Sequence, residues 1–555
     1  MGKLNTSNQP NILIVCIDQW QTHMKLPEDV PLPALRRLES QGVTFDCQYC
    51  TVPICTASRA SMWTGVHAKN TGLWDNTNFA WIHELSSDVP TIGHMLREQG
   101  YYTAFKGKWH LSELPHNEDA LERYGFSDIQ QWGEMFGTPL QGEIYDPAAV
   151  FETVDWLENK SVNLNKPWLL ISSLINPHDI MYLQTDPIEV PHPNGLITGK
   201  QTHAQRLGWF EKNWDISLPD NFSDDYVYQP YGVRAYKEFT DKNYGGLPDD
   251  RHDLWLMRRN YLVNAMRLID AQIMKIIEAM DRMNLWDNTI VLFMSDHGEM
   301  NGAHRMTQKG AIPFDEAAVV NFTACVPGGP QGKRTKAVGS WLDIAPTLLE
   351  FAGLSAEEIH TRYPHLKGRS LKPVILNSDW PGPRGSMDAP GDGVLLAWDG
   401  LHALDYEWSL TGALRDLMDL PPDRDRKRSM YEVGEKYGAP DFRKRTFFRA
   451  VVDGRYKLVR WFSPEEYGNP SDIEVLYATS DVALYDLKND PGELENIGNR
   501  EHPKYNPTLV EYMLRKLHAL IRDEMGEDRC PFDLNLFGTR EVKYAKEVLN
   551  INNKI

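Results

Sequence analysis

The 555-residue sequence has few cysteines and no long apolar run. Six cysteines are too few for a disulfide-stapled secreted protein, so we expect a reducing compartment and a cytoplasmic location. No segment reaches the roughly 18 consecutive apolar residues of a membrane-spanning helix, so we expect no membrane partner. The apolar run at 12–17 is too short for a signal peptide and is typical of a buried strand.

Basic residues are also scarce, with 58 Lys and Arg against 77 Asp and Glu and a formal net charge of −19. The densest basic stretch, 424–428, is short, which argues against a nucleic-acid partner because such binding needs a clustered basic face. If the ligand is an anion, the positive charge that binds it must be local.

Hydropathy patterning predicts an α/β fold from residue 11 to about residue 375, with helices on both faces of a parallel sheet. We expect strands at 11–17, 101–105, 168–173 and 289–294, and helices at 91–99 and 261–283. A Pro- and Gly-rich stretch at 381–396 marks a boundary, after which 447–462 and 482–487 predict a smaller antiparallel unit. We therefore expect a main domain at 1–380 with an insertion at 180–255, and a C-terminal subdomain and tail at 381–555.

Polar pairs follow two of the predicted strands directly. Asp18 and Gln19 come after the first strand, and Asp296 and His297 after the strand at 289–294. Ligands of open α/β sheets bind beyond the carboxyl ends of the strands, and oxygen and imidazole donors there suit one divalent metal ion. The alternative is structural, because an Asp after a strand often caps a helix or forms a turn.

The sharpest local pattern runs from 53 to 65 and contains Cys55 and Arg59. A Cys at the start of a helix, one turn before an Arg, lies where free amides and the helix dipole favour an anion. The structural alternative is a buried cysteine beside an arginine that only packs.

This segment resembles the signature of type I sulfatases, a family within the alkaline phosphatase superfamily. Residues 100–110 resemble the second sulfatase signature, and 295–299 resemble the metal-binding segment of the family. Further matches follow in family order at 176–178, 308–310, 343–347, 484–487 and 490–493. The resemblance implies an α/β fold, an alkaline phosphatase-like mixed sheet sandwiched by helices, with a smaller C-terminal α+β domain carrying an antiparallel sheet.

The resemblance also implies a mechanism in which a maturation enzyme oxidises Cys55 to formylglycine. One hydroxyl of the hydrated aldehyde attacks sulfur, His178 protonates the leaving oxygen, and His110 then removes a proton so that sulfate is expelled. The implied catalytic residues are Cys55, Arg59, Lys108, His110, His178 and Lys309; the substrate-binding residues are Asn76, Lys108, His178 and Lys309; and the metal ligands are Asp18, Gln19, Asp296, His297 and Cys55.

Some positions depart from the commonest sulfatase pattern. The metal pairs Asp-Gln and Asp-His, and Asn76, resemble the phosphonate monoester hydrolase branch, whereas Lys108 and His110 match the sulfatases. Ala57 stands where the modification motif often has proline, so the maturation enzyme that acts is open. A two-zinc phosphatase on the same fold would need a Ser or Thr nucleophile, and only Cys55 occupies that position.

We therefore predict a metal-dependent hydrolase of small sulfate monoesters that also accepts phosphonate monoesters and phosphodiesters. One alternative makes phosphonate monoester or phosphodiester hydrolysis the native activity. Another is a non-catalytic anion-binding protein in which Cys55 stays a thiol. We expect Ca²⁺, with Mn²⁺ or Mg²⁺ as alternatives, and a homo-oligomer, dimer or tetramer, in which the tail at 530–555 contacts a neighbour.

Overall fold

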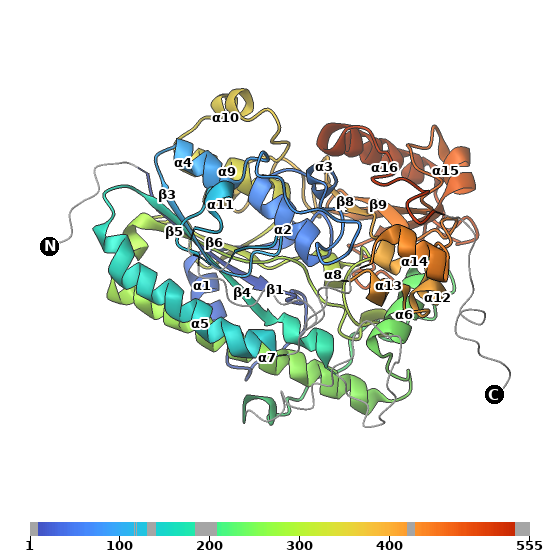
Figure 1. Cartoon of the computed structure of the whole chain (residues 1–555), viewed down its shortest axis with the longest axis horizontal. Coiled ribbons are helices and arrows are strands. Elements are labelled where there is room, and N and C mark those ends of the chain that lie inside the picture. The colour runs from blue at the N-terminus through green and yellow to red at the C-terminus, as the bar shows by residue number, and fades with distance from the viewer. Residues whose placement is uncertain are drawn as a thin grey trace.

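Two β-sheets organise the chain (Figure 1). The polar pairs stand at the carboxyl ends of two central strands of the larger sheet. A computed structural model describes residues 9–115, 117, 119–129, 140–183, 208–418 and 428–538. The strands of the large sheet are β1 (Asn11–Asp18), β2 (Val43–Tyr49), β3 (Tyr102–Gly107), β4 (Trp168–Pro177), β5 (Thr289–Ser295), β6 (Phe322–Cys325) and β7 (Lys333–Ser340).

The large sheet has the order β3-β4-β1-β5-β6-β2-β7 and is mixed. β6 runs antiparallel to both of its neighbours, and the other pairs are parallel. All four strands predicted in this part of the sequence are present, with ends shifted by a few residues. The class implied by the resemblance, a mixed sheet sandwiched by helices, is confirmed. The wholly parallel sheet expected from hydropathy is wrong, because the short strand β6 runs against its neighbours.

Helices cover both faces of this sheet (Figure 1). α1 (Pro33–Gln41), α5 (Gln141–Asp155) and α7 (His252–Arg282) lie on one face, and α2 (Cys55–Thr64), α4 (Ile92–Glu98) and α9 (Ile344–Phe351) on the other. Side chains of β1 alternate between the two apolar layers, Leu13 and Val15 in one, Ile12 and Ile14 in the other. The strand is buried on both faces, so its sequence is continuously apolar.

The C-terminal sheet consists of β8 (Val394–Trp398), β9 (Phe447–Val452), β10 (Tyr456–Phe462) and β11 (Asp481–Asp486) in the order β11-β10-β9-β8. All its pairs are antiparallel, as predicted. The stretch predicted as strand at 447–462 is two strands, because a turn at Gly454, with φ +104°, reverses the chain. α16 (Pro507–Leu520) packs its Leu514 and Leu517 against this sheet.

The predicted insertion at 180–255 is described only in part, since 184–207 lie outside the described residues. Within it the structure has α6 (Tyr231–Tyr244) and the first turn of α7. The predicted start of the long helix at 261 is wrong: α7 begins at His252, because Leu254 and Trp255 are buried and extend the apolar face of the helix.

The remaining helices are short and lie mostly in connections. They are α3 (Ala68–Thr71), α8 (Asp315–Ala318), α10 (Ala356–Arg362), α11 (Lys372–Leu376), α12 (Tyr406–Ser409), α13 (Ala413–Asp416), α14 (Met430–Tyr437) and α15 (Ile473–Thr479). Among the described residues no helix is long and apolar enough to cross a bilayer. Of the predicted tail, 539–555 lie outside the described residues, whereas Phe537 packs on Trp408 of its own chain.

Candidate active site

The carboxyl ends of β1 and β5 bring two carboxylates together. These strands are parallel neighbours with Ile17 opposite Ser295, so Asp18 and Asp296 leave the sheet side by side. Asp296 Oδ1 accepts hydrogen bonds from the backbone amides of Gln19 (3.2 Å) and His297 (2.9 Å). Backbone amides from both predicted pairs thereby orient the carboxylate of Asp296.

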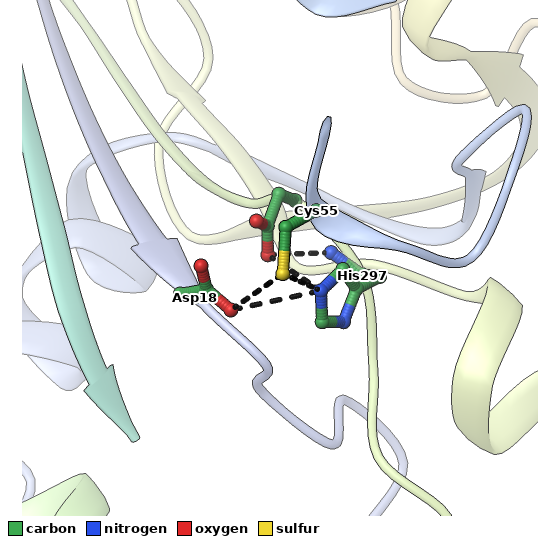
Figure 2. A group of neighbouring side chains, drawn as sticks. Asp18, Cys55 and His297 are labelled. Carbon is green, nitrogen blue, oxygen red and sulfur yellow. Dashed lines mark hydrogen bonds and ion pairs between the residues drawn. The ribbon is translucent and has the colours of Figure 1, made fainter. Parts of the chain in front are cut away.

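Cys55 is the first residue of α2 and lies between these strand ends. Its Sγ is 3.1 Å from His297 Nε2 and 3.7 Å from Asp18 Oδ1, contacts that Figure 2 shows as dashed lines. The ligand atoms of Asp18, Cys55, Asp296 and His297 all lie within 4.8 Å of one another, and all four residues are buried. Two carboxylates, an imidazole and a fourth donor at this spacing fit a single divalent cation.

Arg59, one turn further along α2, neutralises both carboxylates. Its Nε donates to Asp296 Oδ2 (2.9 Å) and its Nη2 to Asp18 Oδ2 (3.1 Å). The remaining nitrogen, Nη1, donates to Ser173 Oγ (2.7 Å) and to the carbonyl of Lys108 (3.1 Å). Arg59 has no solvent-exposed surface, so it acts as a buried link between α2 and four strands of the large sheet, β1, β3, β4 and β5.

The two carboxylates have opposite pKa shifts. Burial by itself raises the pKa of Asp18, but nearby cationic side chains, Lys108 foremost, outweigh it and hold this pKa well below its ordinary value. Burial and the neighbouring Asp18 charge raise the pKa of Asp296. Two like charges this close resist joint ionisation, and a bound cation relieves that repulsion.

Lys108 and His110 follow β3. Gly107, at the end of this strand, has φ +86°, and a Cβ there would lie 2.0 Å from the carbonyl oxygen of Ser173. This close approach lets the amide of Lys108 donate to the same oxygen (2.8 Å), and Lys108 Nζ then reaches Asp18 Oδ2 at 2.7 Å. His110 is buried, and burial together with the Lys108 and Arg59 charges lowers its pKa well below the ordinary value.

His178 and Lys309 complete the cationic side of the site. His178 follows β4, and neither ring nitrogen has a hydrogen-bond partner among the described residues. Burial, then the charges of Lys309 and Lys108, lower its pKa well below the ordinary value. Lys309 Nζ donates to Gln19 Oε1 and lies 3.8 Å from the sulfur of Met181. The structure thus gathers every predicted catalytic and metal-binding residue at one sheet edge.

Glu299 belongs to this network, although the sequence favoured no functional role for it. One carboxylate oxygen accepts from Gln19 Nε2 (2.5 Å), and the other from Arg258 Nη2 (2.8 Å) and the amide of Gln308 (2.9 Å). Because its carboxylate can only accept from Gln19, it turns the amide oxygen of Gln19 toward Lys309. In the sequence, its position just after the Asp296-His297 pair was the feature that could have pointed to Glu299.

A small cavity of about 20 Å³ opens beside Cys55, large enough for roughly one water molecule. Asn76, predicted to bind substrate, lines it and caps the first turn of α2, since its Oδ1 accepts from the amide of Thr56 (3.1 Å). The other residues that line the cavity are Ile54, Phe79, Met181, Tyr244, Gln308, Lys309 and His402.

The Sulfatase family model matches residues 10–354. The chain belongs to the sulfatase family. It is 26% identical to arylsulfatase K of Gallus gallus over 392 residues, which cover 67% of each protein. Its fold is similar to that of a 2-O GAG sulfatase, with a TM-score of 0.64 and 21% identity over 98% of this chain and 100% of the other.

A phosphonate monoester hydrolase of Agrobacterium radiobacter also shares the fold. Its TM-score is 0.60 at 20% identity, covering 92% of this chain and 95% of that chain. Family membership makes this sulfatase a sulfuric ester hydrolase and confirms the resemblance drawn from the motifs.

Proposed function

We propose that this sulfatase cleaves sulfate monoesters with a formylglycine made from Cys55 and accepts phosphonate monoesters and phosphodiesters as secondary substrates. One observation carries the proposal: Cys55 begins a helix and lies against His297 and Asp18, in a buried cluster with Arg59 and Lys108. Helix amides and cations at that point favour an anionic group on residue 55 and an anionic ester beside it.

The donor set fits one divalent metal ion, which Asp18, Gln19, Asp296 and His297 would hold together with the modified Cys55. Gln19 Oε1 has a second lone pair besides the one that accepts from Lys309, so it can serve both. The cation would lower the proton affinity of the nucleophile and offset charge on the ester. Mostly oxygen donors favour Ca²⁺ or Mg²⁺, and the imidazole of His297 keeps Mn²⁺ open.

The side chains of the chain supply the proton transfers. One hydroxyl of the hydrated aldehyde gives its proton to solvent, and its oxygen forms a bond to sulfur while the bond from sulfur to the alcohol oxygen breaks. His178 gives the leaving alcohol oxygen a proton. His110 then takes the proton of the second hydroxyl, the aldehyde re-forms, and sulfate leaves. Water restores the hydrate. Lys108 and Lys309 contact the sulfate oxygens throughout.

In the absence of substrate, the positive charges around His178 oppose its protonation. The cations Lys108 and Lys309 contribute to the low pKa of His178. An anionic ester bound between these two lysines offsets both charges, so we propose that His178 takes up its proton as the substrate binds.

A sulfate ester and a phosphonate monoester place similar tetrahedral anions among the same cations, which supports the proposed promiscuity. Native phosphonate monoester or phosphodiester hydrolysis remains the second candidate, favoured by Asn76 and the Asp-Gln and Asp-His pairs. Comparing kcat/KM on matched aryl sulfate and phenylphosphonate esters separates the two. A large preference for the phosphonate would reverse our ordering.

Mass spectrometry of the peptide that carries Cys55 tests the nucleophile. Formylglycine lies about 18 Da below cysteine. The peptide with the buried Cys325 is the internal control, since it should keep its thiol mass. A fully retained thiol at Cys55 in active native material would rule out the formylglycine mechanism. In inactive material, it would favour a non-catalytic anion-binding protein.

Two partners belong to the same proposal. A formylglycine-generating enzyme must act on Cys55 before α2 is buried, because this residue is 1% exposed in the fold. We also propose a homo-oligomer, dimer or tetramer. Light scattering on the full chain tests this, and a monomer at micromolar concentration would refute it.

A further inference from the structure

The cavity beside Cys55 has a wall that the mechanism above does not use. His402 stands in a short turn, Leu401–Ala403, that follows β8 of the C-terminal sheet. His402 lines the same cavity as Cys55 and Lys309. A residue of the C-terminal part of the chain therefore faces the candidate nucleophile.

The His402 ring is fixed by hydrogen bonds on one edge. Its Nδ1 lies 2.9 Å and 3.1 Å from the two carboxylate oxygens of Asp75. Asp75 is itself fully buried and accepts from the amide of Asn76 (2.8 Å) and from Trp81 Nε1 (3.1 Å). A carboxylate that accepts from Nδ1–H leaves Nε2 as the acceptor in a neutral imidazole.

Aromatic packing fixes the two faces of the ring. Phe79 stacks on one side, with ring centroids 5.0 Å apart and planes 11° from parallel, and Trp81 stacks behind Phe79 at 4.6 Å. Trp398 meets the His402 ring edge-on with centroids 5.2 Å apart, and the Phe239 ring lies 5.7 Å away, tilted by 56°. The ring cannot turn without breaking these contacts, so the orientation of the ring edge that carries Nε2 is fixed.

Nε2 of His402 has no hydrogen-bond partner among the described residues. If the His402–Asp75 pair served only to join the two parts of the chain, His402 would not need to line the cavity of Cys55. The cavity is about the size of one hydroxyl group or water molecule.

We propose that His402 binds a hydroxyl group on the alcohol part of the ester, adjacent to the ester oxygen. The proposal rests on the hydrolase function above and narrows its substrate class to hydroxylated alcohols. Nε2 accepts from that hydroxyl, and Phe79 and Tyr244 supply apolar contact for the carbon skeleton. The described residues that line the cavity include no carboxylate, so this wall favours a neutral alcohol over a cationic one.

The test compares two esters that differ by one hydroxyl group, catechol monosulfate and phenyl sulfate, by released sulfate. For each enzyme the preference quotient is kcat/KM for the hydroxylated ester divided by kcat/KM for the plain ester. Comparing the preference quotient of His402→Phe with that of the wild type cancels the difference in leaving group. We expect the quotient to fall about ten-fold in His402→Phe, because a buried acceptor rejects a substrate that lacks its donor.

Two further variants keep the test decisive. His402→Asn retains a donor toward Asp75 but is too short to reach the cavity, and it replaces the Phe variant if that one does not fold. His360→Ala, on the exposed side of α10, is the control and should leave the quotient unchanged. If a folded His402 variant keeps a quotient within two-fold of the wild type, the inference about His402 is wrong, whereas the proposed hydrolase function still stands. A wild type that cleaves neither ester overturns the proposed function and this inference with it.

Discussion

The two buried lysines Lys309 and Lys457 give a sharp test of the active site, because their surroundings differ. Lys309 is 7% exposed, and its Nζ contacts an amide oxygen and a thioether but, among the described residues, no carboxylate. Lys457 is fully buried and lies 2.6 Å from Asp315 and 2.7 Å from Glu493. Burying an unpaired cation costs free energy, whereas a paired one is compensated.

Replacing each lysine with methionine keeps the aliphatic volume and removes the charge. Lys309→Met should lower kcat/KM for a sulfate ester by about 10²–10³, or roughly 2.7–4 kcal/mol of transition-state stabilisation, the usual effect of losing one oxyanion contact. Its free energy of unfolding should change by no more than about 1 kcal/mol, because no ion pair is lost. Lys457→Met leaves two carboxylates without their cation and should lose about 3–5 kcal/mol of stability.

The measurements are urea unfolding of both variants and steady-state kinetics below the unfolding transition. Where folded, Lys457→Met should keep near-wild-type kcat/KM, because its charge lies outside the cavity of Cys55. The reasoning fails if Lys309→Met retains kcat/KM within a few-fold. It also fails if that variant is destabilised as much as Lys457→Met, since its lost activity would then report unfolding.

Three further predictions concern stability. Added Mg²⁺, Ca²⁺ or Mn²⁺ should raise the melting temperature, and a chelator should reverse this rise. The free energy of unfolding should increase by about 2.7 kcal/mol when the ion is at 100 times its Kd, and a melting temperature that none of the three ions changes would count against the metal site. Burial lowers the pKa of His67 to about 3 from 6.5, so the unfolded state protonates first and stability falls below pH 6.5, by roughly 2 kcal/mol at pH 5. His67→Asn, which can still accept from the amide of Lys69, should remove that loss, and an unchanged pH dependence of unfolding would contradict the assignment. Gly107→Ala should lower the free energy of unfolding by more than about 2 kcal/mol, because its Cβ would meet Ser173. Gly353→Ala, at φ +104° in open space, should lose only the free energy of the backbone strain. Equal losses of stability by calorimetry would refute the clash at Gly107.

Sequence patterning located four of the seven strands of the main sheet, β1, β3, β4 and β5, because strands buried on both faces are continuously apolar. β1 and β5 were predicted almost to the residue for this reason. The strands β2, β6 and β7 were missed, as was β8 of the C-terminal sheet. β6 has only four residues, too few for a periodic signal, and polar residues interrupt the apolar pattern of β2 and β7. The start of α7 was misplaced because its first turn lies in a stretch rich in Pro and Asp, where tertiary burial of Trp255 sustains the helix.

The sequence by itself determined the residue types of the site, since Cys55, Arg59 and the two Asp-led pairs lie in short motifs whose chemistry follows from local position. Only the tertiary structure decided the partners. Ser173 and His402 carry no local signal, because their neighbours in space are far away along the chain. That Arg59 joins both carboxylates, and that the C-terminal part of the chain closes the cavity of Cys55, depends on strand order and packing, which no local pattern encodes.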